Sequence, residues 1–317
     1  MPSSFRPTRR LLLGGAAALA ATPALAFPDH TVRLVSPFNP GGVNDIIARA
    51  LAQPLAGALK VPVVVENRAG AGGGVGAASV ARAAPDGHTM LLGIVDTQVI
   101  NAFIYRNLPY QPERDFTPVS LVTTVPFAIV AGPARPGIKD FAGLVAAARA
   151  ERGGLSFASW GVGSTSHLAF ARVLRQVDAE MLHVPFTGQA PAMQAVMAAQ
   201  VDTMAVPAGV AESMARDGRT RILAVVSPER LPLLPDVPTL RELGFDMTIG
   251  LWQALYAPAR TPAPVVAQLA AAAHEAMRAD SFAEVLKAQA CKPEPSSSEA
   301  LAAMQRRERE AWGDIVT

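Results

Sequence analysis

Nine short apolar runs rich in valine, isoleucine and leucine alternate with alanine-rich stretches along this chain. Runs of this length are typical of buried strands, and the alanine-rich stretches between them have the composition of helices. Such alternation predicts an α/β protein built from parallel layers. The predicted strands are residues 31–36, 61–67, 89–95, 127–132, 155–159, 179–186, 201–206, 221–227 and 252–258.

Helices are predicted at 43–59 and 190–200, and along a C-terminal tail from about 262 to 313. Pro54 falls inside the first of these, where a proline ring is expected to kink or shorten the helix. The pattern Ser296-x-x-Glu299 matches a capping box and predicts a helix start within the tail.

The length of the chain favours two domains. It has 317 residues, more than a single hydrophobic core usually serves. Proline and glycine concentrate at 132–137 and at 228–238, and we expect the chain to cross between domains there.

Residues 1–26 have the layout of an export signal. Arginines at positions 6, 9 and 10 precede an apolar run over 11–21, and Ala-Leu-Ala at 24–26 forms a cleavage site. The paired arginines also match a twin-arginine signal, so the Sec and twin-arginine routes both stay open. Since no later apolar run reaches the roughly 18 residues of a membrane span, we expect a soluble periplasmic protein after cleavage.

Composition argues against a nucleic-acid partner. Hydrophobic residues make up 50% of the chain, charged residues 17% and aromatic residues only 6%, which leaves few rings for base stacking. Loss of three arginines with the signal leaves 25 of the 28 basic residues, against 26 acidic ones. The mature chain is therefore nearly neutral and has no basic excess to attract a polyanion.

Neither cysteine nor histidine forms a metal-binding pattern. Cys291 is the single cysteine, which excludes an internal disulfide. The five histidines, at 30, 88, 167, 183 and 274, include no i,i+4 pair. We predict no metal site and no cofactor.

Three segments, residues 32–52, 61–83 and 155–175, have the order strand, glycine/serine loop, helix. Each would direct the unpaired N–H groups of a helix N-terminus toward the loop. Such an end attracts an anion without any basic side chain. Each loop taken alone is also explained as a tight turn.

Motifs for enzymatic chemistry are weak. Gly72-x-Gly74-x-x-Ala77 with Asp96 as a ribose-binding acid fits a dinucleotide site poorly, because it is not at the first strand–helix turn. The loops hold no phosphate-binding Gly-Lys-Ser/Thr and no Gly-x-Ser-x-Gly elbow. Ser164 and His167 lie three residues apart, but a helix start explains both, and we predict no catalytic residue.

Seven sequence motifs, in this order along the chain, resemble those of a known protein family. They are PFNPGGVNDIIAR, VVVENRAGAGGGVG, APDGHTMLLG, YRNLPYQPERDFTPV, FASWGVGSTSHLA, HVPFTGQAPAMQ and LPDVPTLRELGF. With them the mature sequence closely resembles the Bug-type (TctC-like) extracytoplasmic solute receptors of tripartite tricarboxylate transporters.

The resemblance implies a type II periplasmic binding protein fold with a ligand cleft between two α/β lobes joined by crossing strands. The expected lobes are residues 27–128 with 247–317, and residues 129–246. Such a receptor captures a small carboxylate mainly through helix N-termini and backbone amides, and delivers it to integral membrane permease subunits.

Residues in three loops are expected to hold the ligand, on the same resemblance. They are Phe38, Asn39, Gly41, Gly42, Asp45, Trp160, Gly161, Gly163, Ser164, Thr165, His167, Thr187, Gly188 and Gln189. A carboxylate at Asp45 would repel an anion if it pointed inward, so we expect it to cap loop amides or to act through water. Asn39, Trp160 and Thr187 depart from the family pattern and suggest an aromatic or less-charged carboxylate.

Two other roles stay open. A periplasmic carboxylate sensor would pass its signal to a sensor kinase and differs from a transport receptor only in that partner. An exported enzyme acting on a carboxylate would need a nucleophile that the motifs above do not supply.

Overall fold

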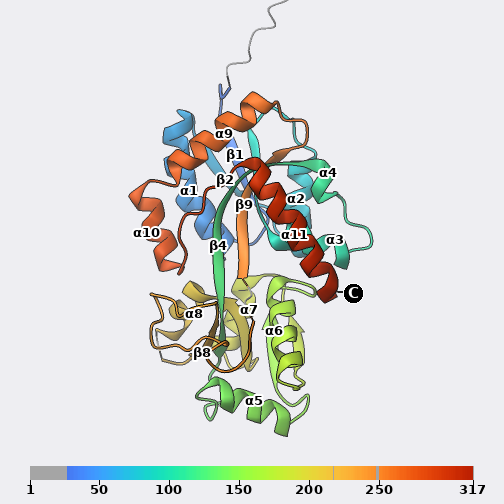
Figure 1. Ribbon diagram of the computed structural model, residues 1–317, viewed down its shortest axis with the longest axis vertical. Coiled ribbons are helices and arrows are strands. Elements are labelled where there is room, and N and C mark those ends of the chain that lie inside the picture. Colours follow the sequence, from blue (N-terminus) through green and yellow to red (C-terminus); the bar gives the residue numbers. More distant parts are fainter. Residues whose placement is uncertain (1–26, 217, 248–249, 317) are drawn as a thin grey trace, which may run out of the picture.

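The computed structural model describes residues 27–216, 218–247 and 250–316, so the predicted export signal at 1–26 lies outside it. Nine strands form one curled sheet in the order β2-β1-β3-β9-β4-β7-β5-β6, with β8 also paired to β4 (Figure 1). Within the described ranges, no helix is both long and apolar enough to span a membrane.

The first lobe is built on five strands. β1 (Val32–Ser36) pairs in parallel with β2 (Val63–Asn67) and with β3 (Thr89–Ile94). β9 (Gly250–Pro258) runs antiparallel to β3 and to the first part of β4 (Phe116–Ala131), and lies between them. One inner strand of this lobe, β9, therefore comes from late in the chain.

The second lobe uses the end of β4. From Phe127 onward β4 pairs antiparallel with β7 (Thr203–Pro207) and β8 (Arg221–Val226). β5 (Ser156–Ser159) continues the sheet in parallel with β7 and with β6 (Leu182–Pro185).

Helices cover both lobes on both sides of the sheet. In Figure 1, α1 and α10 lie on one side of β4, and α2, α3 and α11 lie on the other. The first lobe holds α1 (Val43–Leu59), a 3₁₀ turn (Ala71–Gly73), α2 (Gly74–Ala81), a π-helical turn (Asp96–Ile100), α3 (Asn101–Ile104), α4 (Pro112–Asp115), α9 (Ala263–Ala276), α10 (Asp280–Ala288) and α11 (Ser298–Val316). The second lobe holds α5 (Phe141–Ala150), α6 (Thr165–Gln176), α7 (Gln189–Met197) and α8 (Ala208–Ala215).

The chain passes between lobes along strands. In Figure 1, β4 runs unbroken from one lobe into the other. Gly250 at the start of β9 pairs with Pro126 of β4. A continuous strand keeps its backbone groups hydrogen-bonded through the crossing, which an irregular segment would leave exposed.

The predicted crossings at 132–137 and 228–238 are wrong. Both segments belong to the second lobe: the Arg221 side chain donates to the carbonyl of Arg135, and Val225 forms a bridge with Thr239 just beyond the second segment. The lobe boundaries after 128 and after 246 stay a prediction, since β4 has no break at which a lobe ends.

Other expectations are corrected by packing. The sheet is not wholly parallel, because β9 runs antiparallel to both its neighbours. α1 continues past Pro54, held by the buried side chains of Leu51 and Leu55 on either side of it. The C-terminal tail is three helices, and the last is capped by Ser297, whose hydroxyl accepts from the N–H of Ala300, rather than by Ser296.

Candidate ligand-binding site

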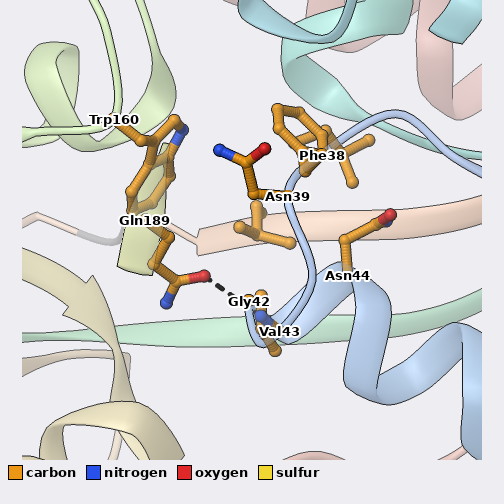
Figure 2. Close-up of a pocket in the computed structure, with 9 residues that line it drawn as sticks. Phe38, Asn39, Gly42, Val43, Asn44, Trp160 and Gln189 are labelled. Atoms are coloured by element: carbon orange, nitrogen blue, oxygen red, sulfur yellow. Dashed lines mark hydrogen bonds between the residues drawn. The ribbon is translucent and has the colours of Figure 1, made fainter. Parts of the chain in front are cut away.

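A pocket of about 380 Å³, which includes the open space at its mouth, lies where the two lobes meet. Figure 2 shows Phe38 and Asn39 on the loop after β1, opposite Trp160 and Gln189 of the second lobe. The pocket is lined by Phe38, Asn39, Gly42, Val43, Asn44, Ile94, Trp160, Gln189 and Leu251. None of these nine residues is charged, and their polar side chains are all carboxamides.

The loop between β1 and α1 is shaped by a turn at Gly41 and capped by Asp45. Gly41 has φ +84°, a left-handed conformation that glycine adopts without strain. Its N–H donates to Oδ2 of Asp45 over 3.0 Å, while Oδ1 of Asp45 accepts from Arg49 and Asn67. Burial raises the pKa of Asp45, but these hydrogen bonds outweigh it and the pKa lies below its usual value. Asp45 thus caps the loop as an anion and is engaged away from the pocket.

Asn44 joins the floor of the pocket to three strands. Its Oδ1 accepts from the hydroxyl of Ser36 over 2.7 Å, and its Nδ2 donates to the carbonyl of Leu92 and to Oε1 of Gln253, each over 3.1 Å. These partners lie on β1, β3 and β9. The side chain is buried and its orientation is fixed.

The lobes touch each other beside the pocket. The N–H of Val43 at the start of α1 donates to Oε1 of Gln189 over 3.0 Å (Figure 2). Nδ2 of Asn39 donates to the carbonyl of Thr187 over 3.3 Å. A Cβ on Gly188 would come within 2.7 Å of that same Nδ2, so glycine permits the approach. The two lobes are therefore in direct contact beside the pocket.

The second loop, between β5 and α6, uses its amides internally. The N–H of Gly161 donates to the hydroxyl of Ser159, and the N–H of Gly163 donates to Nδ1 of His167. Ser164 caps α6: its hydroxyl accepts from the N–H of His167 and donates to the carbonyl of Gly161. Only a rearranged loop would offer the amides of Gly161 and Gly163 to a ligand.

Asp96 lies at the start of the π-helical turn after β3, and its side chain accepts hydrogen bonds from the second lobe. Both its carboxylate oxygens accept from the N–H of Thr165 over 3.2 Å, and one also accepts from the Thr165 hydroxyl. Nε1 of Trp160 donates to it over 3.0 Å. The side chain is buried, and burial raises the pKa of Asp96 to about 6. A carboxylate of the protein thus already occupies the N-terminus of α6.

Two histidine pairs escaped the sequence analysis. His167 and His183 stack with ring centroids 3.9 Å apart, and burial, with the neighbouring His167, lowers the pKa of His183 to about 4. His30 and His88 stack at 3.6 Å beside Asp29. An ion in the plane of one stacked imidazole would lie outside the plane of the other, so this second group is poorly arranged to share a metal.

Five of the fourteen predicted residues line the pocket: Phe38, Asn39, Gly42, Trp160 and Gln189. The remaining nine lie in or next to the same three loops around it: Gly41, Asp45, Gly161, Gly163, Ser164, Thr165, His167, Thr187 and Gly188.

Further residues at or near the site were not predicted, because only the sheet brings them together. Ile94 ends β3 and Leu251 is the second residue of β9, while Asp96 was considered only for a dinucleotide site. β1 and β3 are parallel, and the carboxyl ends of parallel strands meet at one edge of the sheet. The end of β3 could therefore have been predicted as part of the site once the loop after β1 had been placed there.

The geometry accords with the comparisons to known proteins. A family model described as "Tripartite tricarboxylate transporter family receptor" (TctC) matches residues 47–317. The chain belongs to this TctC receptor family.

Individual TctC relatives match over nearly all of the chain. BugT of Bordetella pertussis is 31% identical over 312 residues, which cover 96% of this chain and 94% of BugT. The structure of periplasmic binding protein BugD superposes with a TM-score of 0.86 at 32% identity, covering 91% of this chain and 97% of BugD. MatC of Rhodopseudomonas palustris, solved with bound malate, gives a TM-score of 0.86 at 35% identity, covering 92% of this chain and 100% of MatC.

These matches confirm the assignment to Bug-type, TctC-like receptors and the two-lobed periplasmic binding protein fold. The family and these structural neighbours are binding proteins.

Proposed function

We propose that this TctC receptor captures a small carboxylate in the pocket between its lobes and delivers it to the membrane permease subunits of a tripartite tricarboxylate transporter. The observation that carries the proposal is the pocket itself, formed by the loop after β1 on one lobe and by Trp160 and Gln189 on the other. The malate bound to the related MatC supports a carboxylate as ligand.

The pocket offers hydrogen-bond donors without a basic side chain. Nε2 of Gln189 is buried without a partner, a costly state that a ligand acceptor would relieve. Asn39 and the start of α1 lie beside it. Micromolar affinity needs about 8 kcal/mol, and charge-assisted hydrogen bonds supply roughly 1.5–3 kcal/mol each, so a few such donors suffice.

Site roles follow from these contacts. We propose that Phe38, Asn39, Gly42, Trp160 and Gln189 contact the ligand. The other predicted residues shape the three loops, as Asp45 does through the N–H of Gly41.

Closure of the lobes supplies the signal for transfer. A permease distinguishes loaded from empty receptor only if the ligand contacts the closed form better than the open one. The hydrogen bond from Val43 to Gln189 forms next to the pocket, where a ligand that touches both lobes would strengthen it.

Export places the receptor where it meets its ligand. We propose that residues 1–26 are an export signal and that the mature protein acts in the periplasm, as its relative BugD does.

The test is a thermal melt of the purified chain against mono-, di- and tricarboxylates, amino acids and aromatic acids. A ligand at about a thousand times its Kd adds roughly 4 kcal/mol of stability. One stabilising acid, whose uptake is then lost on deletion of the gene, supports a transport receptor. A stabilising ligand with no carboxylate, or unchanged uptake, contradicts the proposal.

A further inference from the structure

The anion position at the start of α6 is filled from within the protein. In a two-lobed receptor that grips a ligand with helix N-termini, the ends available are those of α1 on the first lobe and of α6 and α7 on the second, which begin at loops around the pocket. The carboxylate of Asp96 lies on the N–H of Thr165 in the first turn of α6.

The negative charge of Asp96 is held by neutral groups. Its donors are the indole N–H of Trp160 and the N–H and hydroxyl of Thr165. The titratable groups that face it are Tyr105 and Tyr110, and burial raises the pKa of both above the usual tyrosine value, so both are neutral near pH 7. No cation on these contacts offsets the charge.

Much of the lining of the pocket is apolar. Trp160 both lines the pocket and donates to Asp96, and Phe38, Ile94 and Leu251 of the first lobe add further apolar surface. The carboxamides of Asn39 and Gln189 lie on the side of the α1 N-terminus.

We propose that Asp96 restricts this receptor to monocarboxylates, because it takes the place at α6 that a second ligand carboxylate would need. The single carboxylate of the ligand lies at the α1 end, and its apolar or neutral body lies against Trp160. This inference rests on the proposed function and specifies its ligand class.

Charge repulsion sets the size of the effect. A second carboxylate about 6 Å from Asp96, at an effective dielectric constant of about 20, weakens binding roughly 100-fold. An uncharged methyl group at the same place meets no such repulsion and gains from contact with the indole ring.

The experiment compares acids in three matched pairs, in each of which one carboxylate is replaced by a methyl group: adipate with hexanoate, malate with 2-hydroxybutyrate, and terephthalate with 4-methylbenzoate. Dissociation constants are measured by calorimetry at pH 7.5 for the wild type, Asp96→Asn and Asp96→Ser. Asp178→Asn is the control, since it removes one acidic charge at the far end of α6, where the side chain is exposed.

We expect the wild type and the control to prefer the monocarboxylate at least about tenfold in a pair that binds. Either Asp96 variant should reduce that preference at least tenfold. Wild-type binding of a diacid as tightly as its partner overturns this inference and leaves the proposed function standing, as does an unchanged ratio in a folded variant. Failure of all six acids to bind any of the proteins counts against the proposed function and this inference together. The wild-type ratio decides the matter even if both variants fail to fold.

Discussion

Oε1 of Gln189 in the second lobe lies 3.0 Å from the backbone nitrogen of Val43 in the first and accepts its hydrogen bond. The amide nitrogen Nε2 of Gln189 is buried beside the pocket without a hydrogen-bond partner. One side chain therefore both joins the lobes and presents a donor.

Replacement of this side chain should weaken closure and binding together. A hydrogen bond of this kind contributes about 1 kcal/mol, so we expect Gln189→Ala to raise the Kd of the best stabilising acid at least about fivefold. Calorimetry and small-angle scattering measure the two effects. Gln194→Ala, an exposed position on the same helix, should leave both unchanged. Equal affinities for the two variants would contradict the assigned role.

A side chain at Gly163 should hold the lobes apart. Gly163 has φ +73°, and a Cβ there would lie 2.7 Å from the Ile104 side chain of the first lobe. Gly153 has φ +70° with nothing within 4 Å, so Gly153→Val carries the same backbone strain without the contact. We expect both valine variants to lose at least about 1–2 kcal/mol of stability.

Only Gly163→Val should remain extended in small-angle scattering with saturating ligand. If both variants close, or neither does, contact with Ile104 is not what limits closure.

Ligand binding should change the fluorescence of one tryptophan. Trp160 lines the pocket, while Trp312 lies on α11 and donates to Glu308. Trp252 follows the lining residue Leu251 on β9 and so points to the opposite face. We expect Trp160→Phe to remove the ligand-dependent change in emission and Trp312→Phe to retain it. A full signal in Trp160→Phe would place the ligand elsewhere.

Acid should stabilise the wild type relative to Asp96→Asn. Burial raises the pKa of Asp96 to about 6, above its value in the unfolded chain. The folded protein therefore binds the proton more tightly, and the resulting stability is fully present below about pH 4 and is lost as the pH rises through about 6. Between pH 7 and pH 5 the stability of the wild type minus that of the variant should grow by about 1 kcal/mol.

Denaturant unfolding at the two pH values measures this difference. The lowered pKa of His183 acts in the opposite direction in both proteins and cancels. A difference that does not change with pH would mean that Asp96 titrates normally.

All nine strands were predictable from apolar runs, but not the full length of β4. Its first part contains Pro118 and Pro126, and proline is rare in a central strand because it lacks a donor for the ladder. The register of β4 against β9 shifts between Pro118 and Ser120, a local irregularity beside the first of them. Whether a strand accommodates these prolines depends on the strands beside it, so a local sequence pattern does not predict it.

The loops of the site were predictable because glycine turns between strand and helix have a local signature. Gly42 belongs to such a loop and lines the pocket, whereas Gln189, which also lines it, was named from the family resemblance. Asp96 and Leu251 were not predictable in this way, because their proximity to the loops depends on the order of strands in the sheet. The hydrogen bond from the N-terminus of α6 to Asp96 is a long-range contact, and no sequence motif indicates it.

The position of β9 between β3 and β4 has a consequence for how the chain acquires its shape. The second lobe draws its strands from one stretch, residues 127–226, and its pairs close shorter loops than the pairs that β9 forms with β3 and β4. The first lobe cannot complete its sheet until residues 250–258 arrive, and this high contact order makes it the slower half to form. A chain that ends before residue 250 would keep the sheet of the second lobe and lack the strand that joins β3 to β4, and the pocket with it.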